Sequence, residues 1–258
     1  MEEKNTIYDY FLVVAGAEFS EGFIKKLRKL NIGIKCIIFI WDKLETTSLS
    51  KSINAFDKIY TFDKKDAEIF NFNFLSSFYS DECKENIADY KEREYDLYYI
   101  GRLRSVARYY YIKSLFEYSR LLKLRFYLKL WVTDKTSKCL PVEYEESLVS
   151  YEKIDYIKNL DYVKKSRIVL ELIHGNQTGL TLRAIESIAT QTKLITTNKD
   201  IVNYDFYNSE NILIIENEKD ILNISRSFFE KPYKKLSIQI VEKYSVKGFI
   251  DTIFNGNF

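Results

Sequence analysis

The stretch that decides the fold is HGNQTGLTLRAIESIATQTKLITTN, residues 174–198. A polar loop with a glycine leads into a helical pattern that carries Arg183 and Glu186, and an apolar strand pattern follows over residues 193–197. Backbone N–H groups and the positive end of the helix dipole make such a loop suitable for a phosphate. Glu186, further along the helix, is placed to accept hydrogen bonds from ribose hydroxyls. The stretch therefore predicts a site for a nucleoside diphosphate.

The composition indicates a globular protein without a metal site. The chain has 258 residues, 46% of them hydrophobic and 29% charged, which suffices for one large domain or two small ones. The net charge of +2 does not demand a nucleic-acid partner. There are three cysteines, no CxxC pair and a single histidine, which argues against zinc and for reduced thiols. We expect no metal and no cofactor.

The sequence contains no apolar run long enough for a transmembrane helix, and its N-terminus, MEEKNT, is acidic and polar. These features do not fit a signal peptide either. We therefore expect a cytoplasmic protein, and we expect any contact with the inner face of the cytoplasmic membrane to be peripheral.

Strand and helix patterns alternate along the chain, with a polar, charged connection at residues 80–94. Predicted strands cover residues 8–15, 34–40, 58–61, 96–100, 125–132, 167–172, 193–197 and 211–215. Predicted helices cover residues 19–30, 48–55, 63–70, 105–122, 151–159, 160–165, 217–229 and 236–254. The alternation predicts an α/β fold with parallel sheets, one before residue 80 and one after residue 95, and ligands at the carboxyl ends of the strands.

Several short motifs occur in an order typical of one superfamily. Ile100-Gly101-Arg102-Leu103 ends a strand, Val149-Ser150-Tyr151 comes later, and Gly179-Leu180-Thr181 precedes Glu186 and LITTN at residues 194–198. This order resembles the donor-binding half of GT-B glycosyltransferases. More narrowly, FDKIYTFDKKDAE, QTGLTLRAIES and KLITTN resemble a bacterial family of lipopolysaccharide or capsule biosynthesis.

The resemblance implies two Rossmann-like halves that face a cleft. Residues 1–80 would form a reduced acceptor-side half, and residues 95–258 the nucleotide-sugar-binding half with the C-terminal helices. It implies a metal-independent glycosyltransferase that moves a sugar from a nucleotide-sugar donor to a hydroxyl of a bacterial surface glycan, with a glycan or lipid-linked glycan as acceptor.

The sequence departs from the superfamily pattern at two places. The usual motif has two glutamates eight positions apart, and here Thr178 stands at the first of these positions. The usual lysine after GRL is missing, and Arg104 and Arg108 are the nearest cations. The missing first glutamate and the short first half favour an alternative, a non-catalytic nucleotide-sugar-binding or degenerate GT-B-like subunit. A third hypothesis, nucleic-acid binding by the basic stretch at residues 102–129, is less favoured than a solvated helix face whose arginines turn toward a diphosphate.

Candidate site residues fall into two groups. The candidate catalytic residues are Asp42, Glu18 and His174. The candidate donor-binding residues are Gly101, Arg102, Arg104, Arg108, Ser150, Tyr151, Gln177, Thr178, Gly179, Leu180, Thr181, Arg183 and Glu186. Each has a plainer interpretation: the glycine loop as an ordinary turn, the arginine and glutamate on the helix as an i,i+3 ion pair, the histidine as structural and the aspartate as a capping group.

Overall fold

The computed structural model describes residues 6–14, 19–42, 44, 52–173 and 178–255. The chain divides into two compact units, each with its own parallel sheet. Unit 1 comprises residues 1–77 and 177–180, and unit 2 comprises residues 78–176 and 181–258. The predicted α/β fold with two parallel sheets is confirmed.

Unit 1 is built on a sheet of four strands in the order β1-β2-β3-β4, all parallel. In chain order its elements are β1 (Tyr10–Val14), α1 (Glu21–Leu30), β2 (Lys35–Ile40), a 3₁₀ turn (Ile53–Ala55), β3 (Lys58–Thr61), α2 (Lys64–Phe70) and β4 (Asn73–Phe74). The β-branched run of β2 is buried from Cys36 onward, as expected for a central parallel strand. Helix α1 begins where the Ser20 side chain accepts a hydrogen bond from the N–H of Phe23.

Unit 2 is built on a sheet of six parallel strands in the order β10-β9-β8-β5-β6-β7. The strands are β5 (Tyr95–Arg102), β6 (Phe126–Trp131), β7 (Val149–Ser150), β8 (Ser166–Glu171), β9 (Lys193–Thr196) and β10 (Ile212–Ile214). The α-helices are α3 (Val106–Leu121), α4 (Tyr156–Lys164), α5 (Leu182–Ala189), α6 (Arg226–Glu230), α7 (Ile238–Lys243) and α8 (Val246–Asn255). The 3₁₀ turns lie at Asp81–Lys84, Ser137–Cys139, Glu146–Leu148, Lys199–Asn203 and Glu218–Asn223.

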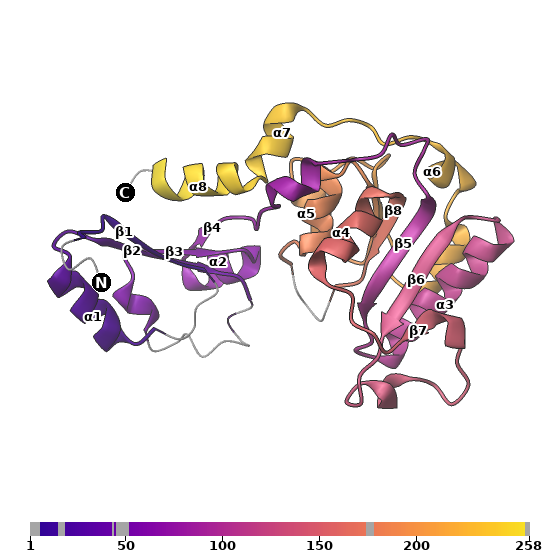
Figure 1. Cartoon of the computed structure of the whole chain (residues 1–258), viewed down its shortest axis with the longest axis horizontal. Coiled ribbons are helices and arrows are strands. Elements are labelled where there is room, and N and C mark those ends of the chain that lie inside the picture. The colour runs from indigo at the N-terminus through magenta and orange to yellow at the C-terminus, as the bar shows by residue number, and fades with distance from the viewer. Residues whose placement is uncertain (1–5, 15–18, 43, 45–51, 174–177, 256–258) are drawn as a thin grey trace. The chain divides into compact units, whose positions relative to one another are not determined.

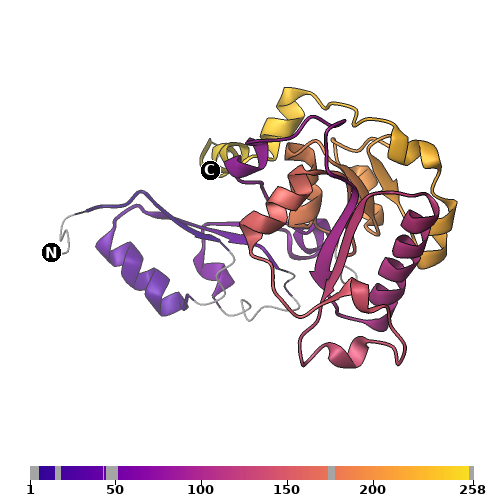
Figure 2. The same cartoon turned by 45° about the vertical axis from the view of Figure 1, so that its right-hand side comes forward.

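The helices of unit 2 cover both faces of its sheet. Leu97 and Tyr99 of β5 pack in the core beside α3, whereas the ring of Tyr98, on the other face, stacks on Tyr162 of α4 at 5.3 Å. In Figures 1 and 2, α3 lies on one side of β5 and α4 on the other, and Figure 1 shows α5 on the side of α4. This sandwich places the first turns of α3, α4 and α5 at the carboxyl edge of the sheet.

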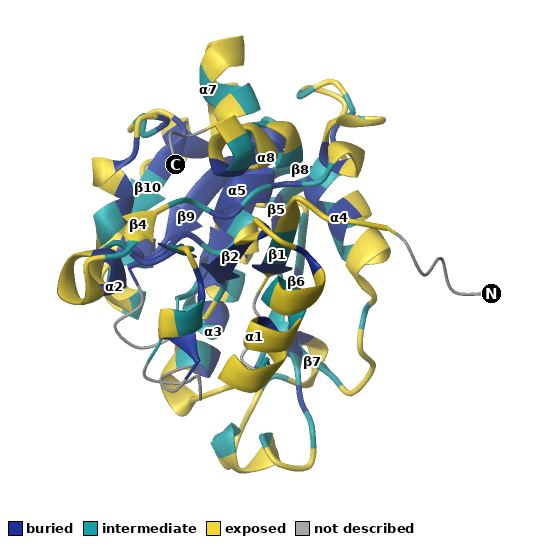
Figure 3. Ribbon diagram, turned by 90° about the vertical axis from the view of Figure 1, so that its left-hand side faces the viewer, coloured by how far each residue is buried: buried dark blue, intermediate teal, exposed yellow. Residues whose placement is uncertain are grey.

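The interior of unit 2 centres on β8, β9 and α5, which are largely dark blue in Figure 3. Every residue of β9 is buried, and so is α5 from Ala184 to Ala189. A buried cation ties this core together: Arg93, 2% exposed, donates to the carbonyls of Ser166 (2.7 Å) and Thr190 (2.8 Å) and to Thr192 Oγ1 (2.9 Å).

The element boundaries differ from the predictions at a few places. The two helical pieces predicted at residues 151–165 are one helix, α4, and the two predicted C-terminal helices are each split. Ser225 caps α6 after a 3₁₀ turn, and α7 ends at Lys243 with Tyr244 as its C-cap, before α8 begins at Val246. Of the helix predicted at residues 48–55, the described part is a 3₁₀ turn. Within the described part of the chain, no helix is long and apolar enough to cross a bilayer.

Candidate functional site

Two adjoining cavities lie at the carboxyl ends of β5, β6 and β8 in unit 2. The cavity on the β8 side, called the inner cavity, has a volume of about 260 Å³. The cavity on the β6 side, called the outer cavity, has a volume of about 490 Å³. Both are lined by Ile100, Gly101, Tyr156, Asn159 and Arg183. The site therefore lies where ligands bind in open parallel sheets.

Hydroxyl and carboxylate caps begin the helices that border the cavities. Thr181 caps α5 by accepting from the N–H of Ala184 at 3.4 Å, and Asp155 caps α4 by accepting from the N–H of Lys158 at 2.8 Å. Ser105 caps α3 by accepting from the N–H of Arg108 at 3.2 Å. Three helix N-termini thus begin at this edge of the sheet, and their dipoles favour a negatively charged ligand.

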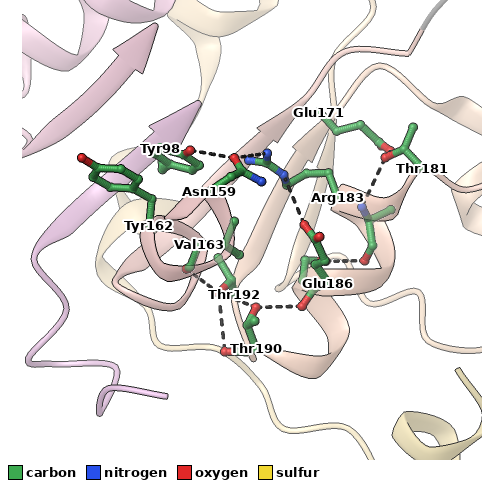
Figure 4. A network of polar contacts seen from close by, with 12 residues as sticks. Tyr98, Asn159, Tyr162, Val163, Glu171, Thr181, Arg183, Glu186, Thr190 and Thr192 are labelled. Carbon is green, nitrogen blue, oxygen red and sulfur yellow. Dashed lines mark hydrogen bonds and ion pairs between the residues drawn. The ribbon is translucent and has the colours of Figure 1, made fainter. Parts of the chain in front are cut away.

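Arg183 is the cation shared by both cavities (Figure 4). Its Nη2 donates to Asn159 Oδ1 at 3.0 Å, and its guanidinium lies over the Tyr98 ring, 5.3 Å from the centroid. Tyr98 Oη donates to the same Asn159 oxygen at 2.7 Å, which fixes the amide. Among the described residues, none accepts a hydrogen bond from the buried Nε and Nη1 of Arg183. These contacts orient the guanidinium, and its Nε and Nη1 keep donors that no described residue uses.

Two buried carboxyl groups line the inner cavity beside this arginine. Glu186, one turn further along α5, is 2% exposed, and burial raises its pKa although Arg183 opposes the rise. Glu171, at the end of β8, is 3% exposed and accepts from the hydroxyl of Thr181, beside it in Figure 4, and from that of Thr196. Burial raises the pKa of Glu171 as well. A carboxyl group at either position can accept hydrogen bonds from hydroxyl groups of a ligand.

The outer cavity combines an aromatic ring with cations. Trp131 ends β6, and the guanidinium of Arg102 lies 5.6 Å from its ring centroid. Lys153 lies 6.0 Å from the same ring. The Nε of Arg102 is buried and has no hydrogen-bond partner among the described residues. This cavity suits a ligand with a flat ring or a negative charge.

The other two predicted arginines have different surroundings. Arg108 donates to the carbonyl of Arg102 at 3.2 Å and to that of Leu172 at 2.8 Å, so it joins the ends of β5 and β8. Arg104 is exposed and lines a separate cavity of about 290 Å³ with Ser105 and Thr197. The structure thus brings Arg102 and Arg183 to the outer cavity. Arg108 also lines the inner cavity, and its two hydrogen bonds to backbone carbonyls give it a structural role as well.

The predicted phosphate loop has a partner in unit 1. The N–H groups of Thr178 and Gly179 donate to Asp63 Oδ2 at 3.0 and 3.2 Å. Leu180, the next residue, is buried. Phosphate binding by this loop stays a prediction, and it now requires that an anion displace the Asp63 carboxylate.

The remaining predicted residues are not brought to the two cavities or are not described. Ser150 ends β7 and exchanges hydrogen bonds with the backbone of Glu152, and Tyr151 is 67% exposed. Asp42 follows β2 and is exposed. His174, Glu18 and Gln177 lie outside the described residues. Their roles stay predictions.

The cavities contain residues that sequence reasoning missed, namely Trp131, Lys153, Tyr156, Asn159 and Glu171. Glu171 had a visible signal, since it is a charged residue inside the apolar run IVLEL that ends a strand. Trp131 likewise ends a predicted strand. Asn159 had no signal in the sequence, because only its contact with Arg183 distinguishes it from a solvent-exposed helix residue.

Within the described ranges, no group of three or more His, Cys, Asp or Glu side chains is arranged to hold a metal ion.

Comparison with known proteins shows similarity in fold and none in sequence. No protein-family profile matches the chain, and no curated protein matches it. Among solved structures, TarM has a TM-score of 0.59 at 16% identity, over 96% of this chain and 55% of TarM. The lipopolysaccharide outer core galactosyltransferase WaaB has a TM-score of 0.55 at 15% identity, over 98% of this chain and 77% of WaaB. An α-glucosyltransferase in complex with UDP and DNA has a TM-score of 0.54 at 14% identity, over 95% of this chain and 77% of that one.

These neighbours are glycosyltransferases of the GT-B class, and the two parallel sheets of this chain match the Rossmann-like halves of that fold. The chain spans about half the length of TarM. At these identities the likeness establishes the fold alone.

Proposed function

We propose that the chain is a glycosyltransferase that moves a sugar from a nucleotide-sugar donor to a hydroxyl of a bacterial surface glycan, a lipopolysaccharide or a capsule. The observation that carries this proposal is Arg183, whose buried Nε and Nη1 have no hydrogen-bond partner among the described residues, beside the buried carboxyl of Glu186 at the carboxyl edge of the sheet. That the fold neighbours are glycosyltransferases supports it.

In this proposal the diphosphate of the donor binds between Arg102 and Arg183. Both arginines line the outer cavity, and each has a buried nitrogen without a hydrogen-bond partner among the described residues. A guanidinium suits an anion of this shape because its N–H groups form a planar fork. As the glycosidic bond breaks, negative charge grows on the leaving diphosphate, and a fixed cation there stabilises the transition state.

Glu186 is assigned to the ribose hydroxyls. It lines the inner cavity next to Arg183, whose positive charge opposes the effect of burial on its pKa. A charged carboxylate accepts stronger hydrogen bonds from hydroxyls than a neutral group does.

The reaction needs few groups. The acceptor hydroxyl loses its proton to a base as its oxygen forms a bond to the anomeric carbon, and the bond from that carbon to the diphosphate oxygen breaks. Asp42, Glu18 and His174 are the proposed candidates for the base. We expect turnover to persist in the presence of a chelator.

A nucleotide panel tests the proposal. Thermal shift with UDP, GDP, CMP and their sugars should give stabilisation by one nucleotide series, worth roughly 2.7 kcal/mol at a hundred times the Kd. Donor hydrolysis and transfer to lipid-linked acceptors should follow. The control Arg226→Gln removes an exposed arginine that pairs only with exposed Glu230 among the described residues, and it should bind like wild type.

Two results would count against the proposal. If no nucleotide stabilises the protein, the donor site is wrong. If a nucleotide binds but its sugar is neither hydrolysed nor transferred across a broad donor and acceptor panel, the chain is a binder without turnover.

A further inference from the structure

The carboxylate of Asp63 connects two segments of unit 1 that are far apart in sequence. The side chain is fully buried, at 0% exposure. Its Oδ1 accepts from the N–H groups of Lys65 (3.0 Å) and Asp66 (3.2 Å), which caps α2, and from Thr178 Oγ1 (2.7 Å). Its Oδ2 accepts from the N–H groups of Thr178 and Gly179.

The two oxygens therefore have different tasks. Oδ1 completes an ordinary helix cap. Oδ2 receives only the two loop N–H groups among the hydrogen bonds of the described residues, and two successive N–H groups aimed at one oxygen form an anion-binding concavity. Burial alone would raise the pKa of Asp63, but the hydrogen bonds from Thr178, Asp66 and Gly179 hold it below its ordinary value. The carboxylate is charged at neutral pH.

The loop also fits closely against the residue before Asp63. A Cβ on Gly179 would lie 2.5 Å from ring carbons of Phe62 and 2.8 Å from its carbonyl oxygen. Only glycine permits this approach without a shift. Gly179 is thus explained by packing on Phe62, and the loop has one defined position on the β3–α2 turn.

The segment that Asp63 holds leads directly into the candidate donor site. Leu180 follows Gly179, and Thr181 then caps α5. Arg183 and Glu186 lie in the first two turns of that helix. Because residues 178–180 run directly into α5, a displacement of these residues also moves the start of that helix. Arg183 follows Leu180 by three positions.

We propose that Asp63 is a positioning residue for sugar transfer, acting as an internal anion whose Oδ2 fixes the loop amides and so sets the position of Arg183. The proposal rests on the proposed function of the site. Asp63 itself contacts neither donor nor acceptor. Misplacement of a transition-state contact by about 1 Å costs on the order of a hundredfold in rate, whereas nucleotide affinity is shared among several contacts and falls less.

The variant Asp63→Asn separates the two oxygens. Asparagine caps a helix as well as aspartate does, so the carbonyl oxygen keeps the α2 cap. The amide NH₂ then replaces Oδ2 and opposes the N–H groups of Thr178 and Gly179. We expect kcat for donor hydrolysis to fall by on the order of tenfold to a hundredfold, with the donor KM within about twofold of the wild-type value.

Ser20→Ala is the matched control, because it removes the cap of α1 in the same unit and leaves the loop unchanged. It should lose stability, by about 1 kcal/mol, without a change in kcat. If Asp63→Asn does not fold, Thr178→Val removes the hydroxyl donor to Oδ1 at nearly constant side-chain shape. It should lower kcat in the same direction by a smaller factor.

Hydrogen exchange provides a test that does not depend on turnover. The amides of Thr178 and Gly179 should exchange at least tenfold faster in Asp63→Asn than in wild type and in Ser20→Ala. If wild type shows no turnover but this acceleration is seen, the proposed function fails while the loop anchor stands. Unchanged exchange, or a kcat equal to that of Ser20→Ala, would overturn the positioning role.

Discussion

Arg183 Nε lies 3.7 Å from Glu186 Oε2, one turn apart on α5, with side-chain exposures of 14% and 3%. The separation is that of an ion pair and exceeds hydrogen-bond length, so the arginine keeps its donors. An almost buried pair of this kind contributes little to stability, because desolvation of both charges offsets their attraction. The pair is thus better explained by binding than by folding.

Glu186→Gln should therefore make the protein more stable at pH 7. Burial raises the pKa of Glu186 above its unfolded value, so the stability that this group contributes is present below the unfolded pKa and is lost as pH rises through the folded one. Removing the buried charge should raise the free energy of unfolding by about 1 kcal/mol, or the Tm by about 2–4 °C. Melts at pH 7 and pH 4 check this, because the advantage should vanish at pH 4. A Tm below that of wild type at pH 7 would contradict the argument.

The same substitution should weaken nucleotide binding. A hydrogen bond from a ribose hydroxyl to a carboxylate is worth roughly 1.5–3 kcal/mol, and a neutral amide keeps only part of it. Calorimetric titration with the nucleotide found in the panel measures the loss. Glu230→Gln, at an exposed position, serves as the control. Equal affinity in a folded Glu186→Gln protein would remove Glu186 from the site.

Arg183→Met should chiefly lower turnover, whereas Arg108→Met should chiefly lower stability. Arg183→Met removes the proposed transition-state cation, so kcat for donor consumption should fall by on the order of 10²-fold or more while donor affinity falls less. Arg108→Met leaves the carbonyls of Arg102 and Leu172 without their donor, so it should chiefly lower the Tm. Steady-state kinetics and thermal melts on both variants separate these effects. Loss of kcat only in proportion to loss of folded protein would exclude the catalytic assignment of Arg183.

The strand patterns were predictable because burial on both faces leaves a continuous apolar run. The run from Ile34 to Ile40 forms β2, and the run from Lys193 to Thr197 forms β9 within one residue. The C-terminal helices were predicted as longer than they are, since apolar spacing continues through Ser225 and Tyr244 although the chain changes direction there. A serine inside a helical pattern is a start signal only when its hydroxyl turns to the backbone.

The site was only partly predictable, for a related reason. Arg183, Glu186 and Gly101 carry local patterns, and the structure brings all three to the inner cavity. Asp63 also has a local pattern, that of a helix cap. This pattern accounts for the residue without its second contact, the one with the loop N–H groups of Thr178 and Gly179. Its bond to Thr178 spans 115 positions, and no local spacing reports a contact of that length.

Substitution of Arg93 should cause the largest loss of stability that we predict. The residue lies in the segment at residues 80–94, which the sequence predicts to be only a polar connection. Arg93 is 2% exposed and donates to three backbone carbonyls, those of Ala88, Ser166 and Thr190, and to the hydroxyl oxygen of Thr192. Arg93→Met should remove the charged donor from these buried acceptors, and each hydrogen bond to a charged group is worth about 1.5–3 kcal/mol. Arg93→Lys should rescue little, because one ammonium group cannot reach acceptors arranged around a planar fork.

Denaturant and thermal melts measure the effect of both Arg93 variants. A loss of about 3 kcal/mol or more corresponds to a fall in Tm of roughly 6–12 °C for a chain of this size. Arg226→Met, at a 70% exposed side chain, should unfold like wild type. Because Arg93 does not line the two cavities at the carboxyl edge, nucleotide affinity of the folded fraction should not change. An Arg93→Lys protein with the wild-type unfolding midpoint would show that charge alone, and not the geometry of the guanidinium, holds these strands together.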